Sequence, residues 1–192
     1  MKLKVCGITN EADALAAAQA GVDYLGYILN YAASPRFVLP NTVRTIIQRT
    51  KQLYPTVQHV GVLVNPTDQL IVEVEQLGVD LLQIYGDIPT NITKPIWQSE
   101  VGGVSQPQSK LVTMLHCDAG FGSGNTLPLD LLKQLRPALP LVIAGGITVD
   151  NVREIIQLCQ PTVVDVNSGV ESVPGKKDIN KIYALRQVIL QN

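Results

Sequence analysis

The chain has no surplus of charge, because 15 lysine and arginine residues are balanced by 16 aspartate and glutamate residues, for a net charge of −1 at pH 7. No basic cluster stands out, so nucleic acid is not expected as a partner. No apolar run approaches the roughly 20 residues of a membrane-spanning helix, so no membrane contact is expected either. Glu11 and Asp13 lie where a signal peptide would have to continue its apolar stretch, which argues against a signal peptide.

Cysteine is scarce, with three residues at positions 6, 117 and 159. An odd number without CxxC or Cys/His spacing argues against a disulfide framework and against a structural zinc site. We therefore expect no metal site, and a reduced, cytoplasmic compartment fits best.

Apolar residues, by contrast, are plentiful. Hydrophobic residues make up 46% of the 192 positions and charged residues 16%, which excludes a disordered or low-complexity chain. A chain of this length can bury a substantial core, and we expect one domain spanning residues 1–192.

Eight short runs of β-branched and aliphatic residues recur along the chain. Several are nearly continuous apolar runs, which is typical of strands covered on both faces. The runs are 2–6, 23–29, 58–64, 80–86, 95–101, 110–118, 141–146 and 162–169.

Helical patterns with start signals lie between most of these runs. Asn10 precedes a helix expected over 11–20, and Asn41 precedes one expected over 42–53. Eight strands alternating with helices predict a parallel sheet, and eight is the number that closes into a (β/α)₈ barrel. The competing fold, an open doubly wound sheet, usually carries GxGxxG after its first strand, and this motif is absent here.

The alternation weakens over residues 87–109, where prolines and glycines interrupt any helical periodicity. We expect the helix after the fourth strand to be very short and the helix after the fifth strand to be missing. The sequence thus predicts a compact barrel with helices 4 and 5 shortened or missing.

Glycine-rich loops follow the last three expected strands, as GFGSG (120–124), AGGIT (144–148) and NSGVE (167–171). In barrel folds the loops after strands 7 and 8 frequently bind phosphate through backbone amides, and glycine permits close approach. One such loop is equally well explained as simple loop punctuation, but three neighbouring loops favour a phosphate-bearing ligand. The residues expected at the phosphate are Gly122, Ser123, Gly124, Gly145, Gly146, Ser168 and Gly169.

Several motifs, taken in order, resemble the phosphoribosylanthranilate isomerase family of tryptophan biosynthesis. They are KVCGIT (4–9), SPR (34–36), VGVLVN (60–65), LQIYG (82–86), the GSG loop, AGGIT and DVNSGVE followed by PGKKD (165–178). The resemblance implies a (β/α)₈ barrel that performs an Amadori rearrangement on an N-linked ribose 5-phosphate without cofactor or metal. We expect a small phosphosugar substrate and a monomer or homodimer.

The resemblance also assigns roles to individual residues. Opening an aminated ribose needs an acid at the ring oxygen, and the rearrangement then needs a base at the sugar C2. The resemblance assigns the base to Cys6 and the acid to Asp118. It places Arg36 at the anthranilate carboxylate, where a planar guanidinium suits two-point recognition. Gln83 is a further substrate-binding candidate, and Asp178 is either a substrate-binding residue or the acidic N-cap of the last helix.

Strand parity predicts a buried charge pair beside Cys6. Lys4 lies two residues before Cys6 and therefore points to the same face, toward the barrel interior. Closure of the barrel makes the last strand a neighbour of the first, and Asp165 has the matching position there. A buried lysine is costly without a partner, so we expect Lys4 to pair with Asp165. The lysine would favour the Cys6 thiolate, and Asp165 would cancel part of its field.

Three positions depart from the family pattern. Tyr85 stands where family members commonly carry histidine, His116 stands where an apolar residue is usual, and Leu127–Leu129 replaces an aromatic and acidic stretch. Two alternatives are therefore kept: a related isomerase acting on another aminated ribose phosphate, and a phosphate-binding barrel with degraded catalysis. The retention of Cys6 and Asp118 favours phosphoribosylanthranilate isomerase.

Overall fold

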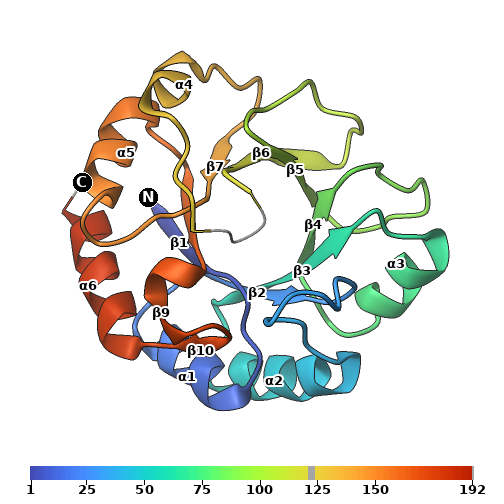
Figure 1. Ribbon diagram of the computed structural model, residues 1–192. Coiled ribbons are helices and arrows are strands. Elements are labelled where there is room, and N and C mark those ends of the chain that lie inside the picture. The colour runs from blue at the N-terminus through green and yellow to red at the C-terminus, as the bar shows by residue number, and fades with distance from the viewer. Residues whose placement is uncertain (121–123, 192) are drawn as a thin grey trace.

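Eight parallel strands close into a barrel in the order of the sequence, and helices surround it (Figure 1). The computed structural model describes residues 1–120 and 124–191, so Gly122 and Ser123 lie outside the described residues. The expected (β/α)₈ fold is confirmed. The strands are β1 (Lys2–Val5), β2 (Tyr24–Ile28), β3 (Gln58–Val64), β4 (Leu81–Tyr85), β5 (Ile96–Val101), β6 (Val112–Asp118), β7 (Leu141–Ile143) and β8 (Val163–Val166).

The α-helices lie outside the ring of strands (Figure 1). They are α1 (Glu11–Gln19), α2 (Pro40–Leu53), α3 (Asp68–Glu75), α4 (Leu129–Gln134), α5 (Val152–Cys159) and α6 (Ile179–Leu190). A 3₁₀ helix, η1 (Ser168–Val170), follows β8. It leads into a small antiparallel hairpin of β9 (Glu171–Val173) and β10 (Lys176–Lys177).

The connections from β4 to β5 and from β5 to β6 are described throughout, and neither contains a helix. Prolines and glycines break any helical run there, as the sequence indicates. Figure 1 shows loops in place of helices beside β5 and β6. The expectation that the helix after the fifth strand is missing is confirmed, and the helix after the fourth strand, expected to be very short, is missing as well.

Two helix starts show how the local sequence sets the element boundaries. The Asn10 side chain accepts a hydrogen bond from the Asp13 backbone N–H at 2.9 Å, which caps α1 as expected. The expected start of α2 at Asn41 is wrong, because the helix begins at Pro40 and Leu39 occupies the cap position. The fixed φ of proline suits the first helical position, where its missing N–H is not needed.

The barrel interior holds a fully buried lysine, Lys4, beside aromatic side chains. The rings of Tyr24 and Trp97 meet edge to face with 4.8 Å between their centres, and the Lys4 Nζ lies 6.0 Å from the centre of the Trp97 ring. Strand β1 pairs with β8 in a register that sets Lys4 opposite Asp165. The charged side chains of Lys4 and Asp165 therefore lie inside the barrel below Cys6, which follows β1.

No helix in the described part of the chain is both long and apolar enough to cross a bilayer.

Candidate active site

A cavity of about 690 Å³, including its open mouth, lies at the C-terminal ends of the strands. This is the end at which barrel enzymes place their chemistry. Seven of the expected site residues line the cavity: Cys6, Gln83, Asp118, Gly145, Gly146, Ser168 and Gly169. Arg36, Gly124 and Asp178 are not among the residues that line it.

Cys6 is buried at the end of β1, with 7% of its surface exposed. Burial raises the pKa of the Cys6 thiol, the positive charge of Lys4 opposes this rise, and Asp165 adds to it. The net result is a raised pKa, so the sequence-based expectation that Lys4 favours the thiolate is outweighed by burial. Gly26 on β2 makes room for this arrangement, since a Cβ there would lie 2.9 Å from both Cys6 Sγ and Lys4 Cε.

The expected pair of Lys4 and Asp165 is present inside the barrel. Lys4 Nζ lies 2.5 Å from Asp165 Oδ2 and also donates to Gln83 Oε1 at 2.7 Å. Burial alone would lower the pKa of Lys4, but the attraction of Asp165 and Cys6 raises it. Burial likewise would raise the pKa of Asp165, but Lys4 and His116 lower it. Both partners are therefore held in their charged forms.

His116, which stands where an apolar residue is usual in the family, is also buried inside the barrel. Its Nε2 lies 3.0 Å from Asp165 Oδ2. Because an ionised carboxylate only accepts hydrogen bonds, this nitrogen carries the proton. Asp165 thus receives a second donor besides Lys4.

Asp118 ends β6 and is 4% exposed. Its Oδ2 accepts a hydrogen bond from the Tyr85 hydroxyl at 2.9 Å, and its Oδ1 accepts one from the Gly120 backbone N–H at 3.2 Å. Cys6 and Asp118 therefore reach one cavity from β1 and β6. A thiol and a carboxyl group that reach one cavity from different strands suit proton transfers at two atoms of one ligand.

Gln83 lines the cavity, but its amide contacts side chains of the barrel. Its Oε1 accepts from Lys4, and its Nε2 donates to the Tyr85 hydroxyl at 3.3 Å. These contacts explain why a polar side chain is 1% exposed at this position. They give no support to its expected role in substrate binding.

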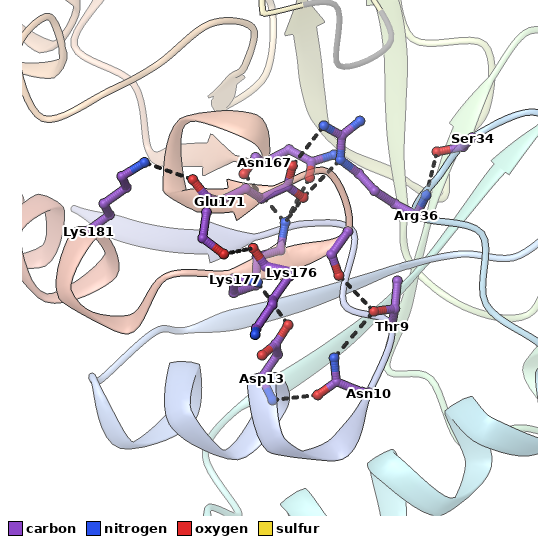
Figure 2. Close-up of polar contacts among 12 residues, drawn as sticks. Thr9, Asn10, Asp13, Ser34, Arg36, Asn167, Glu171, Lys176, Lys177 and Lys181 are labelled. Atoms are coloured by element: carbon purple, nitrogen blue, oxygen red, sulfur yellow. Dashed lines mark hydrogen bonds and ion pairs between the residues drawn. The ribbon is translucent and has the colours of Figure 1, made fainter.

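Arg36 makes a two-point ion pair with Glu171 (Figure 2), and it is not among the residues that line the cavity. Its Nε and Nη2 each donate to one carboxylate oxygen of Glu171 at 2.9 Å. Lys177 Nζ donates to the same carboxylate at 2.7 Å and to the Asn167 side chain at 2.9 Å. Burial alone would raise the pKa of Glu171, but its bonds to Arg36 and Lys177 lower it. Two cations therefore share one ionised carboxylate, which leaves this cluster with a net positive charge.

The same cluster packs onto the residue that follows Cys6. A Cβ on Gly7 would lie 2.7 Å from Asn167 Oδ1 and 2.8 Å from Arg36 Cδ, and its φ of +69° also favours glycine. Gly7 therefore lets the loop after β2 and the segment after β8 meet beside the catalytic candidate.

Asp178 is the N-cap of α6, which is one of the two alternatives open from the sequence. Its side chain accepts from the backbone N–H groups of Asn180 and Lys181 at 2.9 and 3.4 Å. The structure does not bring it to the cavity.

The glycine loops after β6, β7 and β8 pack against one another. A Cβ on Gly145 would collide with Ala119, one on Gly146 would lie 2.6 Å from the backbone oxygen of Gly124, and one on Gly169 would collide with the carbonyl of Ile147. The close contact between these loops is therefore sufficient by itself to require glycine at these positions. The loop residues that line the cavity are held in place by that contact.

Asn151 fixes the loop after β7 from within. Its Nδ2 donates to the Gly146 carbonyl at 2.9 Å, and its Oδ1 accepts from the Thr148 N–H at 2.8 Å. This explains why asparagine follows AGGIT at this spacing.

Sequence reasoning missed Glu171 and Lys177 as parts of the site. Both lie in the segment after β8 that carries the family motif, so the motif contained the signal. The partner of Glu171, Arg36, is 135 positions away in the sequence. No periodicity or spacing connects the two.

Sequence comparisons with known proteins identify the family of this chain. Residues 3–188 match the family described as N-(5'phosphoribosyl)anthranilate (PRA) isomerase. An N-(5'-phosphoribosyl)anthranilate isomerase of Petrotoga mobilis is 34% identical over 198 residues, which cover 95% of this chain and 93% of that protein.

Two solved structures extend the comparison to the fold. The phosphoribosyl anthranilate isomerase of Thermus thermophilus superposes with a TM-score of 0.83 at 28% identity, over 100% of this chain and 99% of that one. A phosphoribosyl anthranilate isomerase in complex with reduced 1-(o-carboxyphenylamino)-1-deoxyribulose 5-phosphate superposes with a TM-score of 0.76 at 29% identity, over 100% of both chains. This chain belongs to the N-(5'-phosphoribosyl)anthranilate isomerase family.

Proposed function

We propose that the chain catalyses the Amadori rearrangement of N-(5-phosphoribosyl)anthranilate to 1-(2-carboxyphenylamino)-1-deoxyribulose 5-phosphate in tryptophan biosynthesis. The observation that carries the proposal is the meeting of Cys6 and Asp118 in one cavity of a chain of this family. The glycine loops at the same cavity add a place for the sugar phosphate.

The reaction needs two proton transfers, and the site offers one group for each. Asp118 gives a proton to the furanose ring oxygen, whose bond to C1 breaks and leaves a Schiff base with the anthranilate nitrogen. Cys6, as thiolate, takes the proton from C2 and gives an enolamine. The enolamine gains a proton at C1 and loses its hydroxyl proton at C2, which yields the ketone. Atoms and electrons balance within the substrate, so no oxidant or reductant is consumed.

The protonation state of the Cys6 thiol sets the pH dependence of this reaction. Because burial raises the pKa of the thiol, only a minority is thiolate near neutrality. Turnover is therefore expected to rise with pH through the neutral range until another group limits it.

The two ends of the substrate would bind to different groups of residues. The backbone amides of Gly145, Gly146, Ser168 and Gly169 are suited to the phosphate, because the loops after β7 and β8 converge there. Arg36 binds Glu171 through one edge of its guanidinium. Its remaining N–H groups can donate hydrogen bonds to the anthranilate carboxylate when the substrate binds. The net positive charge of the Arg36–Glu171–Lys177 cluster supports an anion there.

We further propose that residues 1–192 act as one barrel domain, as a monomer or homodimer in the cytoplasm. The closed barrel supports a single domain. The three cysteines, all of which lie in the described part of the chain, are free, which suits a reducing compartment.

Complementation of a tryptophan auxotroph that lacks this isomerase step tests the function. Growth is expected with the parent chain. Failure to grow while the folded protein accumulates would contradict the proposal and favour either a related isomerase or a barrel with degraded catalysis.

A further inference from the structure

A line of hydrogen bonds crosses the barrel interior from the strand of the base to the strand of the acid. Lys4 Nζ donates to Gln83 Oε1 at 2.7 Å, Gln83 Nε2 donates to the Tyr85 hydroxyl at 3.3 Å, and that hydroxyl donates to Asp118 Oδ2 at 2.9 Å. All four side chains are buried. Lys4 lies two residues before Cys6, so the line joins the surroundings of both catalytic candidates.

The direction of each bond follows from the chemistry of the groups. An ammonium only donates, so Gln83 must present its carbonyl oxygen to Lys4 and its NH₂ group to Tyr85. The Tyr85 oxygen then accepts from Gln83, and its single hydrogen points to Asp118. Burial and the nearby Asp118 raise the pKa of Tyr85 well above its usual value, so this hydroxyl keeps its proton.

The second oxygen of Asp118 is also held. Its Oδ1 accepts from the Gly120 N–H at 3.2 Å, so the carboxyl plane is fixed from two directions. Hydrogen bonds to a buried carboxylate are among the stronger ones in proteins, and losing one frees the side chain to rotate.

We propose that Tyr85 is a positioning residue, which aims the Asp118 carboxyl at the substrate ring oxygen and is itself oriented from Lys4 through Gln83. The proposal rests on the function proposed above, in which Asp118 is the acid. Tyr85 therefore affects the chemical step through Asp118 and has little effect on binding of the substrate.

The first test compares Tyr85→Phe with the matched control Tyr27→Phe. Tyr27 is also a buried tyrosine, and its hydroxyl bonds to the ring of His59 at 2.8 Å, outside the cavity. We expect Tyr85→Phe to lower kcat by about tenfold, because the lost hydrogen bond stabilises the charge that develops on Asp118 as its proton leaves, with KM changed by less than about twofold. Tyr27→Phe should keep the parental kcat. A parental kcat in Tyr85→Phe would overturn the proposal.

The second test asks whether Tyr85 acts through Asp118. In an Asp118→Asn background, adding Tyr85→Phe should leave the residual kcat unchanged, because the group being positioned is already gone. An equal fold-loss in both backgrounds would overturn the proposal. Parental turnover in Asp118→Asn alone would instead overturn the assignment of the acid in the proposed function.

Two further measurements keep the proposal falsifiable if turnover is too low to measure or Tyr85→Phe folds poorly. The changes in denaturation midpoint of Tyr85→Phe, Asp118→Asn and the double variant should be non-additive, which tests the contact without any assay of activity. Additive changes would contradict the contact.

Gln83→Met removes the hydrogen bonds that join Lys4 to Gln83 and Gln83 to Tyr85. It should lower kcat in the parent protein but not in the Tyr85→Phe variant. An equal loss in both would contradict the role of Gln83.

Discussion

Opposing effects act on the pKa of the Cys6 thiol. Burial disfavours its thiolate, Lys4 favours it, and Asp165 weakens the effect of Lys4 because the two charges lie 2.5 Å apart. Lys4 therefore limits the rise in the pKa of the thiol without reversing it. A base of this kind is strong once it is ionised, and the fraction ionised depends on pH.

Replacing Lys4 by Met tests this balance. The Cys6 thiol loses its neighbouring cation, so its pKa should rise further, and alkylation of Cys6 should become slower at every pH below its new pKa. Peptide-resolved alkylation rates measured against pH would report Cys6 separately from Cys117 and Cys159. An unchanged profile would show that Lys4 does not act on the thiol.

The same replacement should destabilise the fold. Asp165 would lose its ammonium partner and keep only the His116 ring as a side-chain donor, and breaking a buried pair from one side costs roughly 3–5 kcal/mol. Adding Asp165→Asn removes the unpaired charge and keeps an acceptor for His116. Denaturant unfolding of Lys4→Met and of the double variant should therefore show a smaller loss in the double variant. Additive losses would mean that the two residues are not coupled.

At the scale of the elements, the cavity depends on contact between successive loops. The loops after β6 and β7 meet at Gly145 and Gly146, and the loops after β7 and β8 meet at Gly169. The backbone amides offered to a phosphate are thus placed by their neighbours as well as by their own strands. A side chain at one of these glycines would displace the adjoining loop.

Gly169→Ala tests this dependence, with Gly103→Ala as its matched control. A Cβ on Gly169 would collide with the carbonyl of Ile147, whereas a Cβ on Gly103 would meet no atom within 4 Å. We expect Gly169→Ala to raise the substrate KM and the inhibition constant of inorganic phosphate by at least about tenfold, since one hydrogen bond to a charged group is worth about 1.5–3 kcal/mol. Gly103→Ala should change neither constant. Parental phosphate inhibition in Gly169→Ala would contradict a phosphate site at these loops.

At the scale of the whole molecule, the sequence was sufficient for the architecture. Eight apolar runs predicted eight strands, the broken pattern over 87–109 predicted the missing helices, and strand parity with barrel closure predicted the pair of Lys4 and Asp165. These features depend on local periodicity and on one geometric rule, which is why they can be read from one chain.

The partners of individual side chains could not be predicted in the same way. Parity places Gln83 inside the barrel, but it does not say that its amide joins Lys4 to Tyr85. Arg36 is expected at the substrate from the sequence, whereas its contact in the structure is with Glu171 from the hairpin after β8, which the sequence did not reveal. Such contacts depend on how loops distant in the sequence fold over the barrel, and no local pattern specifies them.

The central claim is that Cys6 and Asp118 are the base and the acid of one isomerisation. Turnover of N-(5-phosphoribosyl)anthranilate by Cys6→Ala and Asp118→Ala tests it most directly. Cys117→Ala serves as the control, because Cys117 is also buried but packs in the layer between the strands and the helices. Each site variant should lose about 10² to 10⁴ in kcat while still binding the product, and Cys117→Ala should keep the parental kcat. Near-parental turnover in a folded Cys6→Ala or Asp118→Ala variant would contradict the account.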